Sequence, residues 1–392
     1  MKVLHTSDWH IGKRIAGRER LAEQREVLHE IASVCEREKV ELVLVAGDVF
    51  DTYLPSAEAE DVFYGAVKEI AGKDRCVLII SGNHDDNVRL AAASSISEDQ
   101  GIYIYGNAAH SHKDCEDRAL KAVAAETNSI IFCNSAGEEI FVNVLPYPNE
   151  ARLKEDKNPN ESYSDKMRRW IEAGEAQNTR GLPSIFLSHL FVAGGKVSEG
   201  EREIDLGGAR AVALELLPPS CYVALGHLHR RQHFKNNVYY SGSVLQYAFD
   251  ETGSEKSVVV FDIGKGGAQN IREIPLCSGK RLVRLAETSV GGAVELLKKY
   301  PDCYIELTLY LRAPLIAAQV REMQAANEGL VSILPVVQGD ITPHGTVLSR
   351  RKMSSAELFR EYYKSKFTEM PPKELCELFL SLTEDTDETK TS

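Results

Sequence analysis

Five short apolar runs in this chain each end in a small group of aspartate, asparagine or histidine residues. In chain order the runs read "KVLHTSD", "LVLVAGD", "VLIISGNHD", "SIFLSH" and "YVALGH". The polar groups that close or follow them are Asp8 with His10, Asp48 with Asp51, Asn83 with His84 and Asp85, His189, and His227 with His229. Short runs rich in Val, Ile and Leu are typical of buried β-strands. The chain must therefore fold so that polar side chains directly follow its most apolar strands.

Helical patterns separate the first three runs. They span residues 21–37 and about 56–71, so this part of the chain predicts a β-α-β-α-β order, in which helices pack on the faces of a sheet. Because strand ends at one edge of an open α/β sheet share a crevice, we expect all five polar groups to meet at one site. Gly47, Gly82 and Gly226 each directly precede one of these groups, and a residue without a Cβ permits a sharp turn or a close backbone approach there.

The rest of the chain predicts further elements and a second domain. The segment "SIIFCNSAGEEIFVNVLPY" indicates a hairpin, residues 148–178 indicate a polar loop and helix, and "GKGGAQN" resembles a domain boundary. Beyond it, a second β-α-β-α-β pattern is followed by two amphipathic helices and a polar tail. The predicted divisions are residues 1–265, 275–342, 350–383 for the two helices, and 384–392 for a disordered tail.

Charge and cysteine content limit the classes of function. The formal net charge is −12 over 392 residues, so the molecule as a whole does not attract nucleic acid or anionic membranes. If the protein binds a polyanion, a local cluster of basic residues or a partner protein must provide the positive charge. The eight cysteines include no Cys-x-x-Cys pair, which is typical of free thiols in a reducing compartment. The N-terminus lacks a secretory signal, and no apolar run approaches the roughly 20 residues of a membrane span. We therefore expect a cytoplasmic protein.

The donor atoms in the five polar groups predict a metal site. Carboxylate, amide and imidazole groups without a thiolate suit Mn²⁺, Fe or Zn²⁺, and the set is too rich in nitrogen for a Ca²⁺ or Mg²⁺ cage. The set is also too large for one tetrahedral ion, whereas two ions sharing a carboxylate would use it fully. Two such ions activate water and offset phosphoryl charge, so the predicted chemistry is hydrolysis of a phosphate ester.

Individual residues have simpler interpretations. A lone histidine in an apolar run, such as His189, is more often a hydrogen-bonded core residue than a ligand. Asp51 has the position of a helix or loop cap, as do Asp86 and Asn87 before the next helical segment. The joint pattern favours a functional site, because chance seldom places five such groups after five strands.

Four of these motifs, in this order, resemble the calcineurin-like metallophosphoesterase superfamily. They read "DWH", "GDVFD", "GNHD" and "GHLH", with His189 in "LSH" as the additional histidine. More narrowly, "HTSDWHIG", "GDVFDTYLPS" and "GNHDD" resemble the SbcD family, the nuclease subunits of bacterial SbcCD complexes. The resemblance covers nearly the whole chain. It implies an α/β fold: a metallophosphoesterase β-sandwich flanked by helices, with a smaller α/β capping domain that shapes DNA access and C-terminal helices that bind a partner.

The resemblance also implies a role for each motif residue. Asp8, His10 and His229 would hold one metal ion, Asn83, His189 and His227 would hold the other, and Asp48 would bridge the two. His84 would be the catalytic residue that faces the substrate. Relatives in archaea and eukaryotes tend to have a histidine at the position of Asp51, so Asp51 is expected only to orient its neighbours.

The family resemblance further implies Mn²⁺-dependent cleavage of DNA in replication, repair and recombination. The expected activities are a 3′ to 5′ exonuclease on duplex ends and an endonuclease on single strands and hairpins. The expected partner is SbcC, an ATPase with a coiled coil, whose coiled-coil root would bind the helices within 350–383, and a homodimer within a heterotetramer is expected. On pattern alone, those helices could instead dock on the parent domain.

Basic residues beside the first and last motifs are candidate DNA contacts. The candidates are Lys13, Arg14, Arg18, Arg230 and Arg231, with Arg20 and Lys235 nearby. Solvated charges on loops are the alternative interpretation. Two other functions stay open: a different metallophosphoesterase, such as a protein phosphatase or cyclic-nucleotide phosphodiesterase, and a scaffold without catalysis. The intact set of expected ligands argues against the scaffold.

Overall fold

The computed structural model contains two large β-sheets and one small sheet. It describes residues 1–107, 118–149, 152, 161–198, 211–235, 237–337, 359–360, 363, 371–372 and 375–376. Residues 1–310 and 315–336 form one compact unit. The predicted partner helices at 350–383, apart from a few single positions, and the predicted tail at 384–392 lie outside the described residues.

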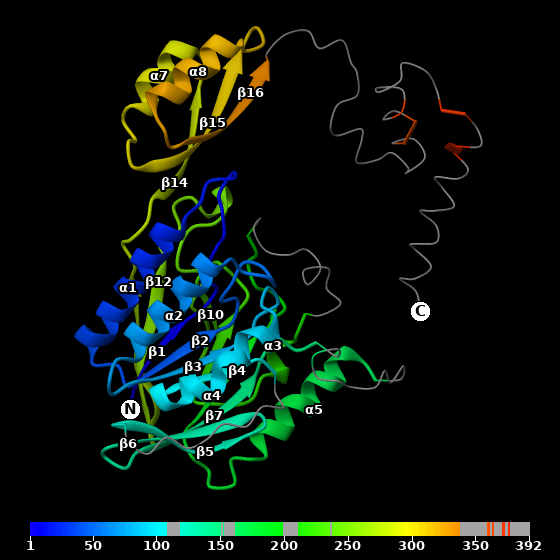
Figure 1. The fold of residues 1–392 in the computed structure, drawn as a ribbon. Helices are drawn as coiled ribbons and strands as arrows, with labels where there is room; N and C mark the ends of the chain where they lie inside the picture. The colour runs from blue at the N-terminus through cyan, green and yellow to red at the C-terminus, as the bar shows by residue number, and fades with distance from the viewer. Residues whose placement is uncertain are drawn as a thin grey trace. The chain divides into compact units, whose positions relative to one another are not determined.

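The first sheet has six strands, and its centre is parallel (Figure 1). In order across the sheet, they are β13 (Gly267–Pro275), β12 (Ser257–Gly264), β1 (Lys2–Thr6), β2 (Leu42–Ala46), β3 (Cys76–Ile80) and β4 (Ile102–Tyr105). The strands from β1 to β4 run parallel, while β12 pairs antiparallel with both β1 and β13.

The second sheet has seven strands and is mixed. In order, they are β10 (Gln232–Phe234), β11 (Val238–Tyr240), β9 (Tyr222–Gly226), β8 (Ser184–His189), β7 (Glu139–Leu145), β6 (Ser129–Asn134) and β5 (Leu120–Glu126). Strands β7, β8, β9 and β11 are parallel. The predicted hairpin is confirmed as the antiparallel pair β6 and β7.

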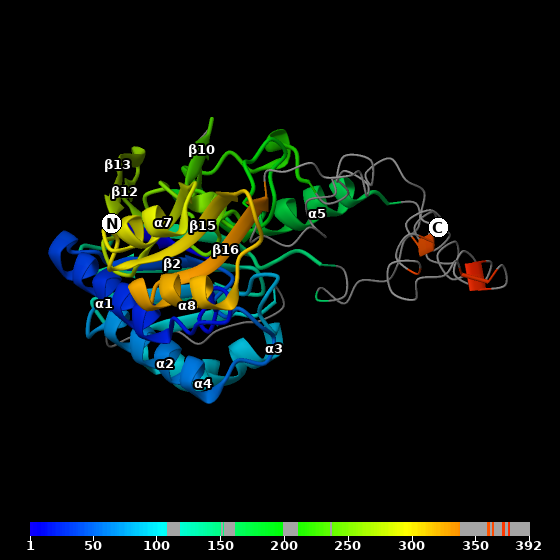
Figure 2. The ribbon, with the colours of Figure 1, turned by 90° about the horizontal axis from the view of Figure 1, so that it is seen from above.

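Helices pack against both large sheets, and Figure 2 shows the helices of the first sheet together on one side, with the helix of the second sheet apart from them. The α-helices of this part are α1 (Leu21–Glu38), α2 (Ala57–Ala71), α3 (Asn87–Leu90), α4 (Ser94–Ser97) and α5 (Tyr163–Glu175). Short 3-10 turns are η1 (Ala91–Ala93), η2 (Glu98–Gln100), η3 (Leu214–Leu216) and η4 (Phe249–Glu251). The predicted helices at 21–37 and 56–71 are confirmed as α1 and α2, and α5 is the helix expected within 148–178.

The alternation of side chains along the strands explains this layering. In β1 and β2, Leu4 and Val43 face a core shared with α1 and α2, whereas Val3 and Leu44 face a second core between the two sheets. A third core packs Trp170 of α5 and its neighbours against the far face of the second sheet. Because the inner strands are buried on both faces, they read as continuous apolar runs. The predicted sandwich flanked by helices is confirmed.

The segment "GKGGAQN" is a hairpin, not a linker. Gly264 pairs with Gly267 across Lys265 and Gly266, and Gly267 has a left-handed φ of +83°, which a residue without a Cβ adopts easily. Strand β13 then continues the first sheet to Pro275. The first sheet therefore continues past residue 265, where the sequence analysis places the end of the first domain, because a glycine-rich tight turn resembles a linker in sequence. The division into domains stays a prediction.

The small sheet follows β13 and has the predicted β-α-β-α-β order. Its strands are β14 (Arg281–Glu287), β15 (Cys303–Leu311) and β16 (Leu330–Val337), and its helices are α7 (Val290–Leu297) and α8 (Ala317–Ala326). Figure 1 shows the two helices side by side against this sheet. In the described part of the chain, every helix is too short or too polar to cross a lipid bilayer.

Candidate metal centre

The predicted site lies where strand ends from both large sheets come together. Asp8, Asp48 and Asn83 follow β1, β2 and β3 of the first sheet, whereas His189 ends β8 and His227 follows β9 of the second. The five groups meet, as expected, and the strands that carry them belong to both sheets of the sandwich. Short apolar runs predict strands and do not reveal which sheet each strand joins.

The backbone is strained where it carries these side chains. Asp8, His10, Asp48 and His227 have φ values of +52°, +44°, +49° and +104°, a region that residues with a Cβ seldom adopt. Hydrogen bonds hold the first loop in this shape, since the Asp8 amide donates to the Gly47 carbonyl and the His10 amide donates to the Asp48 carbonyl, both at 3.0 Å. Such strain clusters at functional sites, where the surrounding fold holds it in place.

Glycines allow the loops to pack this closely. A Cβ at Gly82 would overlap the amide and carboxylate of Asp48, and one at Gly226 would overlap the carbonyl of Ala46. A Cβ at Gly47 would lie 2.5 Å from Nδ1 of His189, and the φ of +87° there also favours glycine. The close backbone approach predicted for these three glycines is therefore confirmed.

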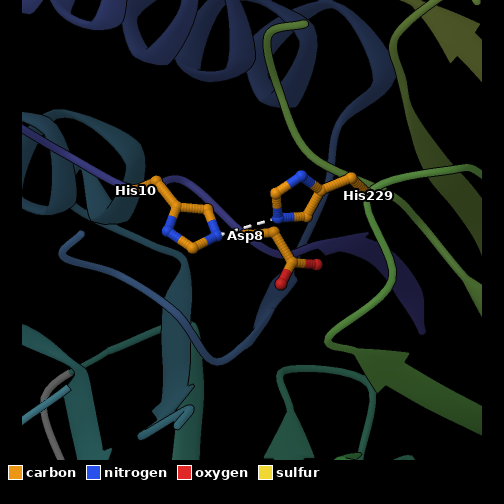
Figure 3. A group of neighbouring side chains, drawn as sticks. All are labelled: Asp8, His10 and His229. Atoms are coloured by element: carbon orange, nitrogen blue, oxygen red, sulfur yellow. Dashed lines mark hydrogen bonds between the residues drawn. The ribbon is translucent and has the colours of Figure 1, made fainter. Parts of the chain in front are cut away.

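The first group of candidate ligands comprises Asp8, His10 and His229 (Figure 3). Their donor atoms all lie within 4.8 Å of one another, and all three residues are buried. The Nε2 atoms of His10 and His229 are 3.0 Å apart. The Asp8 carboxylate also accepts a hydrogen bond of 3.0 Å from the His227 amide, which links this group to the β9 loop.

The second group comprises Asn83, His189 and His227. The Asn83 Oδ1 atom lies 2.9 Å from Nε2 of His189 and 3.1 Å from Nδ1 of His227. Asp48 lies between the two groups, because its Oδ2 atom is 3.6 Å from Nε2 of His10 and 3.5 Å from Nε2 of His189. All seven predicted ligands therefore lie together.

His84 lies beside the first group. Its backbone amide donates to Oδ1 of Asp48 at 2.8 Å, and its Nδ1 atom lies 2.8 Å from the Asp51 carbonyl. The ring meets that of His10 edge to face, with centroids 4.7 Å apart. This arrangement leaves Nε2 as the ring nitrogen of His84 that does not face Asp51.

Asp51 is not a helix cap in this structure. The cap of α2 is Ser56, whose side chain accepts from the Ala59 amide. The Asp51 carboxylate instead lies 2.8 Å from Nζ of Lys13 and 3.4 Å from Nδ1 of His10. Burial alone would raise the Asp51 pKa, but His10 and Lys13 outweigh it and hold the pKa below its usual value. The position fits the expected orienting role, while the capping prediction for Asp86 is confirmed at α3.

The protonation states fit a cation in this cluster. Burial lowers the pKa of His10 and His227 to about 3, so both rings are neutral and can offer lone pairs. Burial raises the pKa of Asp8 to about 6. For His189, burial alone would lower the pKa, but the Asp48 and Asp8 carboxylates raise it to about 9. The cluster contains several buried carboxylates and few positively charged side chains. A bound divalent metal ion would neutralise this negative charge.

The donor chemistry also fits two metal ions. The cluster offers only oxygen and imidazole nitrogen atoms, and the Nε2 atom of His227 is buried without a hydrogen-bond partner among the described residues. A buried imidazole nitrogen without a partner costs folding free energy. A bound metal ion would supply the missing partner. The residues present therefore fit the divalent ions expected from the sequence.

Several further buried residues support the cluster, and the sequence analysis gave none of them this role. Asp85 accepts from the amides of Val49, Phe50 and Gly82, which ties two ligand loops together. Its place beside Asn83 and His84 in the motif was a signal for this role. Gln24 donates to the His10 carbonyl at 2.7 Å, and Glu251 lies 3.5 Å from Nδ1 of His229. Neither Gln24 nor Glu251 lies in a motif, so the sequence held no signal for them.

The candidate DNA-contact residues all have partners within the chain. Lys13 binds Asp51, Arg14 pairs with Glu19, Arg18 donates to the Leu330 carbonyl, Arg230 pairs with Asp250, and Arg231 pairs with Glu273. Arg20 is buried and pairs with Glu23. A cavity of about 770 Å³ is lined in part by Lys196, Arg230, Arg231 and His233. DNA contact by these residues stays a prediction.

Comparison with known proteins agrees with the geometry. Residues 1–231 match the family model described as calcineurin-like phosphoesterase. The SbcD subunit of the SbcCD nuclease from Bacillus subtilis (strain 168) is 34% identical to this chain, and the alignment covers 99% of both proteins. The protein of the same name from Rhodobacter capsulatus is 33% identical over 87% of each chain, and that from Staphylococcus epidermidis is 29% identical over 70% of each.

Proposed function

Because the chain belongs to the calcineurin-like phosphoesterase family, and to the SbcD group of nuclease subunits within it, we propose that its buried cluster is the dinuclear metal centre of a DNA nuclease. The protein is a metal-dependent phosphodiester hydrolase. The three relatives compared are all named as parts of a nuclease, which does not favour a protein phosphatase or a cyclic-nucleotide phosphodiesterase.

One observation carries the proposal of two metal ions. The Asp48 carboxylate lies between two groups of ligands, 3.6 Å from His10 on one side and 3.5 Å from His189 on the other. A carboxylate placed between two sets of nitrogen donors is the arrangement that two ions share. In this proposal Asp8, His10 and His229 hold one ion, Asn83, His189 and His227 hold the other, and Asp48 contributes to both.

The ions, when bound, supply activation of water and neutralisation of charge on the phosphoryl group. The chain supplies position and proton control. Asp51 orients the rings of His10 and His84, because its carboxylate lies near Nδ1 of His10 and its carbonyl near Nδ1 of His84. Nδ1 donates to this carbonyl, and we assign Nε2 of His84 the role of stabilising the transition state or protonating the leaving oxygen.

The finer details rest on the resemblance of the chain to its relatives. We propose that Mn²⁺ is the bound ion, that the enzyme acts as a 3′ to 5′ exonuclease on duplex ends, and that it cleaves single strands and hairpins. The proposed partner is an SbcC-type ATPase with a coiled coil, bound as a heterotetramer with two copies of this chain in the cytoplasm. The names of the relatives, each one component of an SbcCD nuclease, support a two-component complex.

Cleavage of a 5′-labelled blunt duplex tests the proposal. The full-length protein is assayed with Mn²⁺, with and without the ATPase and ATP, beside the His84→Ala variant. We expect the labelled strand to shorten from its 3′ end, faster with partner and ATP, and this shortening to be at least about 100-fold slower in the variant. If the protein hydrolyses a small chromogenic phosphodiester but does not cleave DNA, the proposal of a metal centre stands and the proposal of DNA as substrate fails.

A further inference from the structure

We infer that Glu251 is a positioning residue for His229 and thereby determines how tightly one of the two metal ions binds. This inference rests on the proposed dinuclear centre. Glu251 ends the 3-10 turn η4, and its side chain is fully buried. Its Oε1 atom lies 3.5 Å from Nδ1 of His229, on the side of the ring opposite to His10. No metal-binding motif contains Glu251, and it offers no atom to the three groups of candidate ligands.

The Glu251 carboxylate is held rigidly in this place. Its Oε1 atom accepts hydrogen bonds of 3.1 Å from the amides of Tyr247 and Ala248. Its Oε2 atom pairs with the buried ammonium group of Lys256. A carboxylate fixed by two backbone amides and a buried cation cannot turn away from the imidazole that it faces.

Lys256 also holds the backbone of His229. Its ammonium group donates to the His229 carbonyl and to the Ser243 hydroxyl, both at 2.8 Å. The ring and the main chain of His229 are therefore fixed by the two members of one buried ion pair.

Other site histidines show the same arrangement with different partners. For His189, Nδ1 faces the Ala46 carbonyl at 2.8 Å while Nε2 faces Asn83 and Asp48. For His10, Nδ1 faces Asp51 while Nε2 faces Asp48 and His229. At His189 this contact is a hydrogen bond, and at His10 it is a longer contact of 3.4 Å with a carboxylate. An oxygen that faces Nδ1 favours the proton on that nitrogen and leaves the Nε2 lone pair directed into the cluster. Glu251 occupies the equivalent place for His229, and its negative charge makes the ring a stronger donor.

Glu251 has a purely structural alternative. Its contacts with Tyr247, Ala248 and Lys256 would also stabilise the η4 turn if the metal affinity did not depend on it. The two roles differ in one measurable quantity. Loss of stability weakens both metal sites together, whereas loss of positioning at His229 weakens one site and leaves the site of Asn83, His189 and His227 intact.

Calorimetric titration of the metal-free, full-length protein with Mn²⁺ measures this quantity. The variants are Glu251→Gln, which keeps the shape and removes the charge, and Glu175→Gln, a control on α5 whose carboxylate accepts a hydrogen bond from Asn143.

We expect wild type and control to bind two Mn²⁺ ions. We expect Glu251→Gln to bind one ion unchanged and the other about 10- to 100-fold more weakly, the usual effect of losing a partner of a metal-bound histidine. When one further equivalent of Mn²⁺ is added after the tight site is filled, the electron paramagnetic resonance spectrum of Glu251→Gln should show isolated Mn²⁺ ions. The wild type should show coupled ions.

Each other outcome has a defined meaning. Two unchanged affinities in Glu251→Gln would overturn the inference, and so would an equal loss at both sites with a lower melting temperature. If wild type itself does not bind two ions, the proposed dinuclear centre fails and not the role of Glu251 alone. If Glu251→Gln does not fold, the double variant Glu251→Gln/Lys256→Met removes the unpaired buried charge and should show the same selective loss.

Discussion

The Nε2 atoms of His10 and His229 lie 3.0 Å apart, although 219 residues separate them in the chain. Two buried imidazole nitrogens this close face each other either as donor and acceptor or as joint ligands of a cation. With Asp8 in the same group and both rings buried, the second arrangement explains why the fold brings them together.

Metal binding should therefore stabilise the folded protein. We expect Mn²⁺ at about 100 times its dissociation constant to add roughly 2.7 kcal/mol to the free energy of unfolding, because it binds the native state alone. The measurement is the melting temperature of chelator-treated protein with and without Mn²⁺. The His229→Ala variant should show a smaller shift, and an identical shift in this variant would exclude His229 as a ligand.

His84 should matter for the reaction and not for metal affinity. We expect His84→Ala to lower kcat about 10²- to 10⁴-fold on both DNA and a small phosphodiester, the range for loss of a proton-transfer group. Its Mn²⁺ affinity should stay near that of wild type. Because His84 also lies within reach of His10 and Asp48, a large loss of Mn²⁺ affinity would instead identify it as a ligand.

Arg14 and Arg18 should contribute to DNA binding alone. Arg14 forms an exposed pair with Glu19, an interaction that contributes little to stability, so its guanidinium group is available to phosphate. The double variant Arg14→Ala/Arg18→Ala should cleave DNA more slowly, with a weaker salt dependence, and should hydrolyse a small chromogenic phosphodiester at the wild-type rate.

Arg168→Ala on α5 is the matched control for this pair, because Arg168 is also exposed and paired, with Asp165. It should cleave DNA as wild type does. Equal loss of activity on both substrates in the Arg14/Arg18 variant would show that these residues support the fold, since Arg18 donates to Leu330 of the small sheet.

Gly82 and Gly65 should respond oppositely to the same substitution. A Cβ at Gly82 would overlap Asp48, so we expect Gly82→Ala to lose more than about 1 kcal/mol of stability and to bind Mn²⁺ poorly. A Cβ at Gly65, inside α2, meets no atom within 4 Å, so Gly65→Ala should add about 0.5 to 1 kcal/mol. Chemical denaturation measures both changes. Neutral behaviour of Gly82→Ala would show that the β3 loop can move away from Asp48.

The partner-binding prediction concerns the chain beyond Arg350. Deleting these residues should abolish co-purification with a coiled-coil ATPase while Mn²⁺-dependent hydrolysis of a small phosphodiester persists. The hydrolysis rate serves as the control for folding of the remaining chain. An intact complex after the deletion would place the contact elsewhere.

The sequence predicted the strands and the clustering of the candidate ligands, because these residues lie at or just after the ends of apolar runs. Asp48 after "LVLVA" and His227 after "YVALG" are recognisable from local pattern alone. The meeting of two sheets was not predictable in this way, because strand pairing depends on contacts between distant segments. For the same reason Glu251 and Gln24 were missed: each acts on a ligand more than ten residues away, and only the fold brings them together.

The assembly of the centre from both sheets also bears on protein synthesis. A nascent chain that has left the ribosome only as far as β8 carries Asp8, His10, Asp48, Asn83 and His189, but it lacks His227 and His229. In the proposed centre, neither group of ligands is complete until β9 and the loop after it have been translated and paired with β8. An interrupted translation product would therefore lack part of the proposed centre, and we expect a chain able to cut phosphodiesters only once both sheets have been made.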